Sequence, residues 1–270
     1  MKRVLTAAVL MAVLWVVIKK TTPAAFFALM AVGIGFAAWE CYRLLESRGD
    51  RPFRVLGIVA SLALAWSFLE ARPVFSAAVP LLAVTALAIV AAMARRDTPD
   101  AMLRAASSTL FPVLFVGMTL GTVVGLRASA GDDGTDTLLL LLVCVICSDT
   151  AAYYVGSAIG RHRMAPVLSP RKTWEGAAGG LVASVGGALV AHFWFYQRLG
   201  LAHALALGAI LSAAGVLGDL AESMVKRAAG AKDSSALLPG HGGFLDRMDS
   251  LLFAGPALYY YYRIFLESAP

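Results

Sequence analysis

Apolar stretches alternate with short charged segments along almost the whole chain. The apolar stretches run for about 15 to 22 residues, close to the length of helix that crosses the hydrocarbon core of a bilayer. The pattern therefore predicts an all-α polytopic membrane bundle. We expect about nine transmembrane helices, at residues 4–18, 23–39, 54–69, 73–93, 105–126, 137–159, 176–196, 202–220 and 248–266.

The basic residues predict an orientation for this bundle. With the N-terminus in the cytoplasm, 17 of the 23 Lys and Arg residues fall at cytoplasmic ends or loops. Loops rich in Lys and Arg stay on the cytoplasmic side. An odd number of helices then places the C-terminus outside, so we expect an N-in, C-out protein of the cytoplasmic membrane whose charged segment at 223–249 faces the cytoplasm.

Composition supports the membrane assignment and limits the possible functions. Only 15% of the residues are charged and 59% are hydrophobic, whereas an ordinary soluble domain has about 25% charged residues. The net charge of +6 follows mostly from basic cytoplasmic loops, and nothing in the sequence indicates a nucleic-acid partner. Three cysteines, two of them inside one apolar stretch, do not form a disulfide framework.

Polarity divides the chain into two parts. We expect residues 1–130 to be membrane scaffold helices without a buried acid, and residues 131–270 to be the catalytic half. Small residues recur every fourth position at 117–125 and at 176–188. Such spacing lets helix backbones approach closely within a membrane, so these two segments are predicted helix contacts.

One helix face in the second half gathers polar side chains. Asp219, Glu222, Ser223 and Lys226 have the spacing i, i+3, i+4, i+7 and therefore share a face. Asp246 and Asp249 are three residues apart where the last helix begins. An acid at a membrane helix end is costly unless it is paired, and it therefore indicates a functional site.

Carboxylates with nearby Lys and Arg residues favour chemistry on phosphates. Mg²⁺ takes one or two protein carboxylates together with water and substrate phosphate oxygens, and Lys and Arg balance the remaining phosphate charge. The segment 239–243, Pro-Gly-His-Gly-Gly, predicts a tight turn with N–H groups close to an anion. These features favour phosphoryl or nucleotidyl transfer.

Simpler interpretations remain open for individual residues. Lys226 and Arg227 also suit a topology signal, and Asp219 also suits an ion pair with Lys226. His241 also suits a turn without chemistry. Asp149, inside the stretch 137–159, is either a metal or substrate contact or the partner of a buried base.

At four places the residues resemble the phosphatidate cytidylyltransferases, also called CDP-diacylglycerol synthases. The segment 223–249 reads Ser-x-x-Lys-Arg-x4-Lys-Asp-x5-Pro-x-His-Gly-Gly-x-x-Asp-Arg-x-Asp and matches that family's signature completely. Segments 149–153, 169–176 and 218–223 are also similar. The resemblance covers roughly residues 145–265, and the first half resembles the family only in hydropathy.

The resemblance implies a reaction, its cofactors and a dimer. CTP and phosphatidic acid would give CDP-diacylglycerol and pyrophosphate, with Mg²⁺ required, K⁺ associated with the metal site, and a homodimer formed within membrane lipids. Under this hypothesis Asp219 and Asp246 bind Mg²⁺, with Asp249 as a further ligand or outer partner. The remaining residues contact substrate: Lys226, Arg227, Lys232 and Arg247 hold the phosphates, Ser223 and His241 orient them, and Ser169, Arg171, Lys172 and Asp149 line the headgroup or nucleotide site.

Two other function classes compete with this hypothesis. In a CTP-dependent polyprenol kinase an alcohol attacks the γ-phosphorus, so CDP rather than pyrophosphate is released. A transporter of anionic lipids would show internal repeats and paired broken helices, which the sequence lacks.

Overall fold

The computed structural model describes residues 18–69, 76–129, 134–235, 237 and 242–267, and these residues are mostly helical. A two-stranded antiparallel hairpin is the only sheet among them. The helices are α2 (Pro23–Ser47), α3 (Arg54–Leu69), α4 (Ala78–Ala94), α5 (Pro99–Pro112), η2 (Val113–Met118), α6 (Thr119–Ser129), α7 (Gly134–Ile159), α8 (Trp174–Trp194), α9 (Leu201–Ala228), α10 (Leu245–Met248), α11 (Leu251–Tyr261) and η4 (Tyr262–Leu266), and the strands are β1 (Arg163–Ala165) and β2 (Ser169–Thr173).

Five helices in the described part of the chain are long and apolar enough to cross a membrane, which supports a multi-pass membrane protein. Two shorter helices, α3 and α4, are also apolar. Eight of the nine predicted ranges overlap helices in the structure. All of the range 4–18 except its last residue lies outside the described residues, and the count of nine spans stays a prediction.

Short polar segments start several of these helices. Thr22 and Thr98 each accept a hydrogen bond from the backbone N–H three residues later, and a proline follows each of them. A threonine cap satisfies an otherwise unpaired N–H, and proline is pre-organised for the first helical position. Thr173 caps α8 in the same way, so α8 begins directly where β2 ends.

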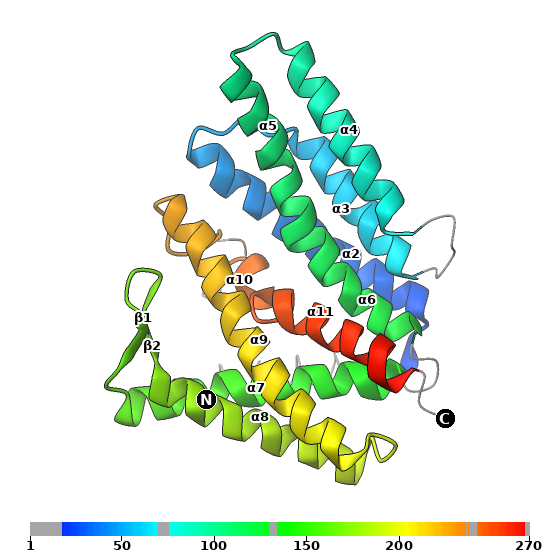
Figure 1. The fold of residues 1–270 in the computed structure, drawn as a ribbon, viewed down its shortest axis with the longest axis vertical. Helices are drawn as coiled ribbons and strands as arrows, with labels where there is room; N and C mark the ends of the chain where they lie inside the picture. The colour runs from blue at the N-terminus through cyan, green and yellow to red at the C-terminus, as the bar shows by residue number, and fades with distance from the viewer. Residues whose placement is uncertain (1–17, 70–75, 130–133, 236, 238–241, 268–270) are drawn as a thin grey trace.

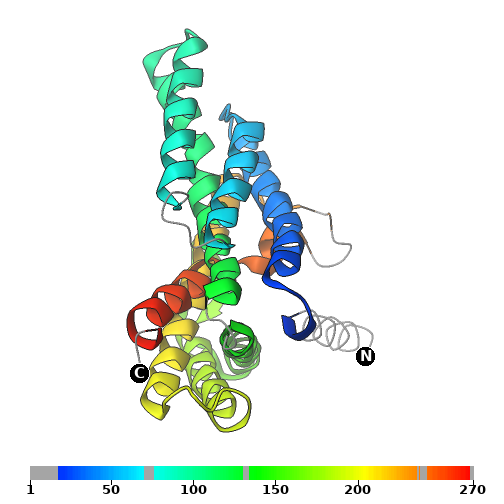
Figure 2. The same ribbon diagram turned by 90° about the vertical axis from the view of Figure 1, so that its right-hand side faces the viewer.

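The helices form two groups that α11 connects (Figures 1 and 2). Helices α2 to α6 form one group, in which α4 lies at the outer edge against α3 and α5. Helices α7, α8 and α9 form the second group, in which α7 and α8 run side by side. Helix α11 packs against α6 of the first group and α9 of the second.

Small residues bring the helices together as the sequence predicts. A Cβ atom added to Gly117 would lie 2.6 Å from the Cα atom of Ser61 on α3. A Cβ atom added to Gly180 would lie 2.9 Å from the carbonyl oxygen of Ser148 on α7. Both predicted small-residue faces are therefore real helix contacts, between α3 and the η2–α6 segment and between α7 and α8.

The segment between α7 and α8 differs from the all-α prediction. It folds into the β1–β2 hairpin, in which Arg163 pairs with Thr173 and Ala165 with Ser169. The carboxylate of Glu175, in the first turn of α8, accepts hydrogen bonds from the backbone N–H groups of Arg161 and His162. These contacts fasten the hairpin to the start of α8.

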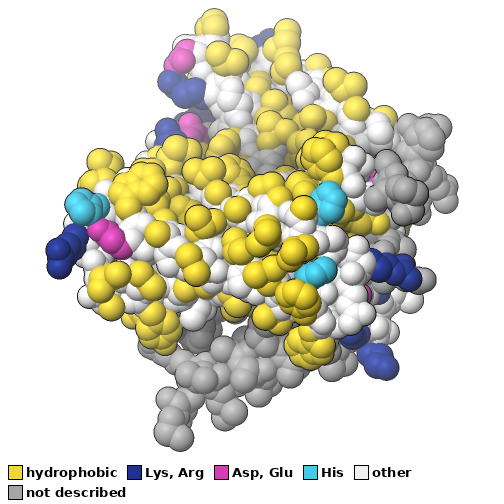
Figure 3. All heavy atoms as spheres, turned by 60° about the horizontal axis from the view of Figure 1, so that its bottom comes forward, with side chains coloured by type: hydrophobic (Ala, Val, Ile, Leu, Met, Phe, Trp, Pro, Cys, Tyr) yellow, Lys and Arg dark blue, Asp and Glu magenta, His cyan; other side chains and the backbone are white. Residues whose placement is uncertain are grey.

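Exposed apolar side chains cover the outer surfaces of the second helix group. Figure 3 shows a mostly hydrophobic face with charged side chains gathered at its edges. The exposed residues of α7 and α8 include Tyr153, Ile159, Val182, Val190 and Trp194. A broad apolar surface of this kind suits contact with lipid rather than water.

Candidate active site at the end of α9

The polar face of α9 forms as predicted. Ser223 Oγ donates to Asp219 Oδ1 at 3.4 Å, and Lys226 Nζ lies 2.5 Å from Glu222 Oε2. Asp219 and Lys226 are only partly exposed, and Glu222 is completely buried. One face of a membrane helix therefore carries three ionisable groups into the interior of the protein.

Three carboxylates meet at this face. One oxygen each from Asp219, Glu222 and Asp249 lies within 4.8 Å of the others. Asp249 comes from the junction of α10 and α11, so two helix ends present acids to one another. We call these three residues the carboxylate cluster.

Asp246 lies beside this cluster and binds a lysine. Lys226 Nζ donates to Asp246 Oδ1 at 2.6 Å while it also contacts Glu222. Asp246 Oδ2 accepts three further hydrogen bonds, from the hydroxyl and backbone N–H of Ser234 and from the N–H of Gly243. Burial alone would raise the pKa of Asp246, but these hydrogen bonds hold its pKa at about 2.

The hairpin brings a second lysine to the cluster. Lys172 Nζ lies 2.7 Å from Asp219 Oδ2. Asp219 is thus paired with Lys172, and Lys226 is paired with Glu222 and Asp246, so the simple Asp219–Lys226 ion pair that the sequence left open is not the one formed. Asp149 Oδ2 accepts a hydrogen bond from Ser250 Oγ at 3.0 Å, which places it close to Asp249.

The other predicted substrate residues lie around this centre at different depths. Arg227 donates to the carbonyl oxygens of Leu168 and Ala231 and so ties the hairpin to the segment after α9. Arg171, Lys232 and Arg247 are exposed, and Ser169 is partly buried in β2. His241 lies outside the described residues.

The sequence analysis missed one acid, Glu40, which the first half of the chain contributes to the surroundings of the site. Glu40 of α2 is completely buried, so the expectation that residues 1–130 contain no buried acid is wrong. It accepts hydrogen bonds from the hydroxyls of Ser234 and Ser235 and from the backbone N–H groups of Phe244 and Leu245. The available signal was a lone acid in the apolar stretch that continues past residue 39.

The carboxylate cluster has the chemistry of a divalent-cation site. Among the described residues, no donor makes a well-aligned hydrogen bond to either oxygen of Glu222, although both oxygens are buried. Buried carboxylates need compensation by hydrogen bonds or positive charge, and the single ammonium group of Lys226 is shared with Asp246. Oxygen ligands of this kind suit Mg²⁺, so the residues fit the metal that the resemblance implies.

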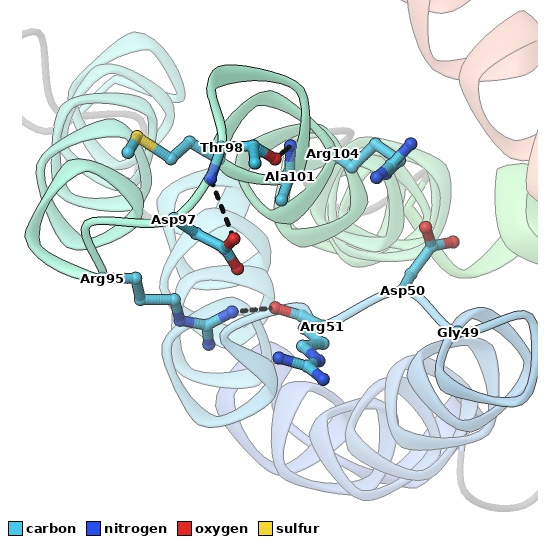
Figure 4. Close-up of a pocket in the computed structure, with 9 residues that line it drawn as sticks. Gly49, Asp50, Arg51, Arg95, Asp97, Thr98, Ala101 and Arg104 are labelled. Atoms are coloured by element: carbon cyan, nitrogen blue, oxygen red, sulfur yellow. Dashed lines mark hydrogen bonds between the residues drawn. The ribbon is translucent and has the colours of Figure 1, made fainter.

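A pocket of about 390 Å³ lies elsewhere, between the α2–α3 and α4–α5 turns (Figure 4). Arg51, Arg95 and Arg104 contribute to its lining together with Asp50 and Asp97. Arg95 donates to the carbonyl oxygen of Arg51, as Figure 4 shows, and Arg104 pairs with Asp100 on its own helix. Two of the three arginines are therefore engaged, and no residue of the carboxylate cluster lines this pocket.

Comparisons with known proteins identify the family of this chain. The cytidylyltransferase family matches residues 1–265. The chain is 36% identical to a phosphatidate cytidylyltransferase of Haemophilus influenzae, over 97% of this chain and 98% of that protein. It is 44% identical to the Brucella suis protein of the same name over 54% of each chain, and 41% identical to the Staphylococcus haemolyticus protein over 57% of each. The match spans only about half the length of the latter two relatives. The family match and the Haemophilus alignment extend over nearly the whole chain. We conclude that this protein belongs to the cytidylyltransferase family.

Proposed function

We propose that the protein condenses CTP with phosphatidic acid to give CDP-diacylglycerol and pyrophosphate. The observation that carries this proposal is the carboxylate cluster, which sits beside two lysines at the end of a helix long enough to span a membrane. The relatives named phosphatidate cytidylyltransferase support the choice of substrates. The polyprenol kinase hypothesis has no comparable support.

The proposed chemistry needs no protein nucleophile. A phosphate oxygen of phosphatidic acid, ionised at neutral pH, attacks the α-phosphorus of CTP, and the bond to the β-phosphate oxygen breaks as pyrophosphate leaves. Catalysis of such a displacement consists mainly of positioning and charge neutralisation. The protein must therefore hold two anionic substrates in line against their mutual repulsion.

The side chains at the end of α9 divide this work. Asp219, Glu222 and Asp249 would hold Mg²⁺, which neutralises phosphate charge when bound. Asp246 is the other predicted ligand, and its position against Lys226 suits a residue that orients the lysine or joins the metal shell when substrate displaces the ion pair. A K⁺ ion at the same centre remains part of the proposal.

Basic side chains around the cluster would bind the phosphates. Lys226 and Lys172 lie against the carboxylates and would hold the triphosphate and the phosphatidate headgroup. The exposed residues Arg171, Lys232 and Arg247 would add positive charge at the entrance. Arg227 would act indirectly, because its guanidinium group ties the hairpin to the end of α9.

We further propose that this site faces the cytoplasm, where CTP is made available, and that the protein is a homodimer in the cytoplasmic membrane. The distribution of Lys and Arg along the chain supports this orientation. The broad exposed apolar surfaces (Figure 3) are compatible with contact to lipid or to a second copy.

The test is an assay of the purified protein in detergent. Phosphatidic acid, Mg²⁺ and each nucleoside triphosphate in turn are supplied, and pyrophosphate and CDP-diacylglycerol are measured. The proposal expects both products with CTP and neither after chelation of Mg²⁺. Release of CDP with a polyprenol instead would establish a kinase, and a total lack of turnover with phosphatidic acid would overturn the proposed function.

A further inference from the structure

Glu40 has no role in the chemistry proposed above. It is a completely buried acid on α2, about 180 residues before the carboxylate cluster in sequence. Four uncharged donors lie within hydrogen-bond distance of its two oxygens: Ser235 Oγ at 2.5 Å, Leu245 N at 2.8 Å, Ser234 Oγ at 2.9 Å and Phe244 N at 3.1 Å. All four belong to the segments on either side of the Pro-Gly-His-Gly-Gly sequence.

These contacts place Glu40 next to the residues that bind Asp246. Ser234 Oγ lies 2.9 Å from Glu40 Oε2 and 2.7 Å from Asp246 Oδ2. A hydroxyl carries a single proton, so Ser234 donates to one of these carboxylates at a time and the two acids compete for one donor. Asp246 in turn binds Lys226, and Lys226 contacts Glu222 of the carboxylate cluster. A continuous series of polar contacts therefore leads from α2 to the proposed reaction centre.

The packing around Glu40 is fitted to this arrangement. A Cβ atom added to Gly243 would collide with Glu40 Oε1 and Ser234 Oγ, so a larger residue there would push the Glu40–Ser234 contact apart. Phe36, one turn before Glu40, stacks on Phe244 with 5.0 Å between the ring centroids. One face of α2 thus holds this segment through both polar and aromatic contacts.

We propose that Glu40 is a positioning residue for the nucleotidyl transfer proposed above. It holds the segments on either side of the Pro-Gly-His-Gly-Gly sequence, thereby fixes Asp246, and through Asp246 sets where the ammonium group of Lys226 stands beside the cluster. This inference rests on the proposed function for its catalytic part. The α2 helix, although it belongs to the half predicted as scaffold, is then a component of the active site.

The test replaces Glu40 with glutamine in the full-length protein. A glutamine has nearly the same shape, but its NH₂ group cannot accept a hydrogen bond. It would face groups that donate to the carboxylate in the wild type, so at least one hydrogen bond is lost. We expect Glu40→Gln to lower kcat at least tenfold while the KM for phosphatidic acid stays within about twofold. Glu46→Gln is the matched control, because Glu46 is on the same helix and makes only a 3.4 Å contact with Arg54 at the surface, and it should keep wild-type kinetics.

A second measurement reads the contact without using activity. Hydrogen–deuterium exchange of the peptide that contains Phe244 and Leu245 should be at least tenfold faster in Glu40→Gln, whereas exchange in α8 should not change. Faster exchange with an unchanged kcat per folded molecule would reduce Glu40 to a structural role and overturn the proposal. Unchanged exchange and unchanged kcat would overturn it as well.

Ser235→Ala keeps the proposal testable where Glu40→Gln fails to fold. This variant removes one donor to Glu40 and should lower kcat about threefold with the same selective gain in exchange. In the double variant the two effects on kcat should be less than multiplicative, because both changes act on one contact. Multiplicative effects would contradict the shared contact. A wild-type protein without CTP-dependent turnover would refute the proposed function, while the exchange measurement would still decide whether Glu40 holds the segment.

Discussion

Glu40 and Glu222 are two completely buried acids in the same protein, and their surroundings are opposite. Glu40 lies within hydrogen-bond distance of two hydroxyls and two backbone N–H groups. Glu222 faces two further carboxylates and shares one lysine with Asp246. Burial of a carboxylate is costly unless hydrogen bonds or positive charge compensate it. Glu40 has neighbouring donors and needs no cation, whereas Glu222 lacks such donors and has capacity for one.

The two acids also come from different halves of the chain and yet act on one lysine. Lys226 contacts Glu222 directly and reaches Glu40 through Asp246 and Ser234. A count of charged residues alone therefore does not identify a metal site. What distinguishes the two positions is how many donors the neighbouring backbone supplies.

The largest effect should come from removing charge from the carboxylate cluster. Asp219→Asn and Asp249→Asn keep the shape of each side chain but weaken cation binding, so we expect turnover of CTP to fall at least a hundredfold, in the range found for loss of one catalytic electrostatic contact. Pyrophosphate release in detergent measures this. Mg²⁺ should raise the melting temperature of the wild type and have less effect on either variant.

Turnover within threefold of the wild type in both of these variants would show that the carboxylate cluster does not hold the metal. Glu222 would then be an uncompensated buried acid without a function, and its contrast with Glu40 would not identify a metal site. Glu46→Gln serves here again as the control for a loss of charge outside the site.

Loss of the shared lysine should affect stability as well as catalysis. Lys226→Met removes the ammonium group that compensates Glu222 and Asp246, and breaking a buried ion pair typically costs about 3–5 kcal/mol. We expect a lower melting temperature in detergent and a higher KM for CTP. If a cation is the missing partner of the cluster, Mg²⁺ should stabilise this variant more than the wild type. Equal stabilisation of both proteins would contradict that expectation.

A smaller, substrate-selective effect is expected from the hairpin. Charge-assisted hydrogen bonds to a phosphate contribute about 1.5–3 kcal/mol, so Arg171→Ala combined with Lys172→Ala should raise the KM for phosphatidic acid about tenfold or more. Initial rates at varied phosphatidic acid in mixed micelles measure this. Arg163→Ala, an exposed arginine on β1, is the matched control. An unchanged KM in the double variant would leave the basic loop as a topology signal.

Local patterns predicted most of the fold. The helix ranges followed from apolar length, and the close contacts of Gly117 and Gly180 followed from small-residue spacing. The hairpin was not predicted, because its strands are only three and five residues long and carry no alternating pattern. Strand pairing at that length depends on the two helices that hold its ends.

Only the part of the site that lies on a single helix could be predicted from the sequence. The shared face of Asp219, Glu222 and Lys226 follows from helical periodicity, and the position of Asp246 near the start of the last helix follows from where the last apolar stretch begins. Which acid joins the cluster depends on the approach of α10 and α11 to α9, and the sequence does not encode that distance locally. Glu40 was missed for the same reason, since its partners lie almost 200 residues away.

The smallest effect should come from the pocket of Figure 4. Arg104 pairs with Asp100 four residues earlier on α5, and both side chains are more than half exposed. Exposed pairs of this kind contribute about 0.3–0.5 kcal/mol, so Arg104→Ala should leave the melting temperature nearly unchanged and turnover within about twofold. Thermal unfolding and the pyrophosphate assay check both values. Water already solvates this arginine, so its removal leaves no unpaired buried charge. A tenfold loss of turnover would therefore show that charged residues outside Glu40 and the carboxylate cluster contribute to the reaction.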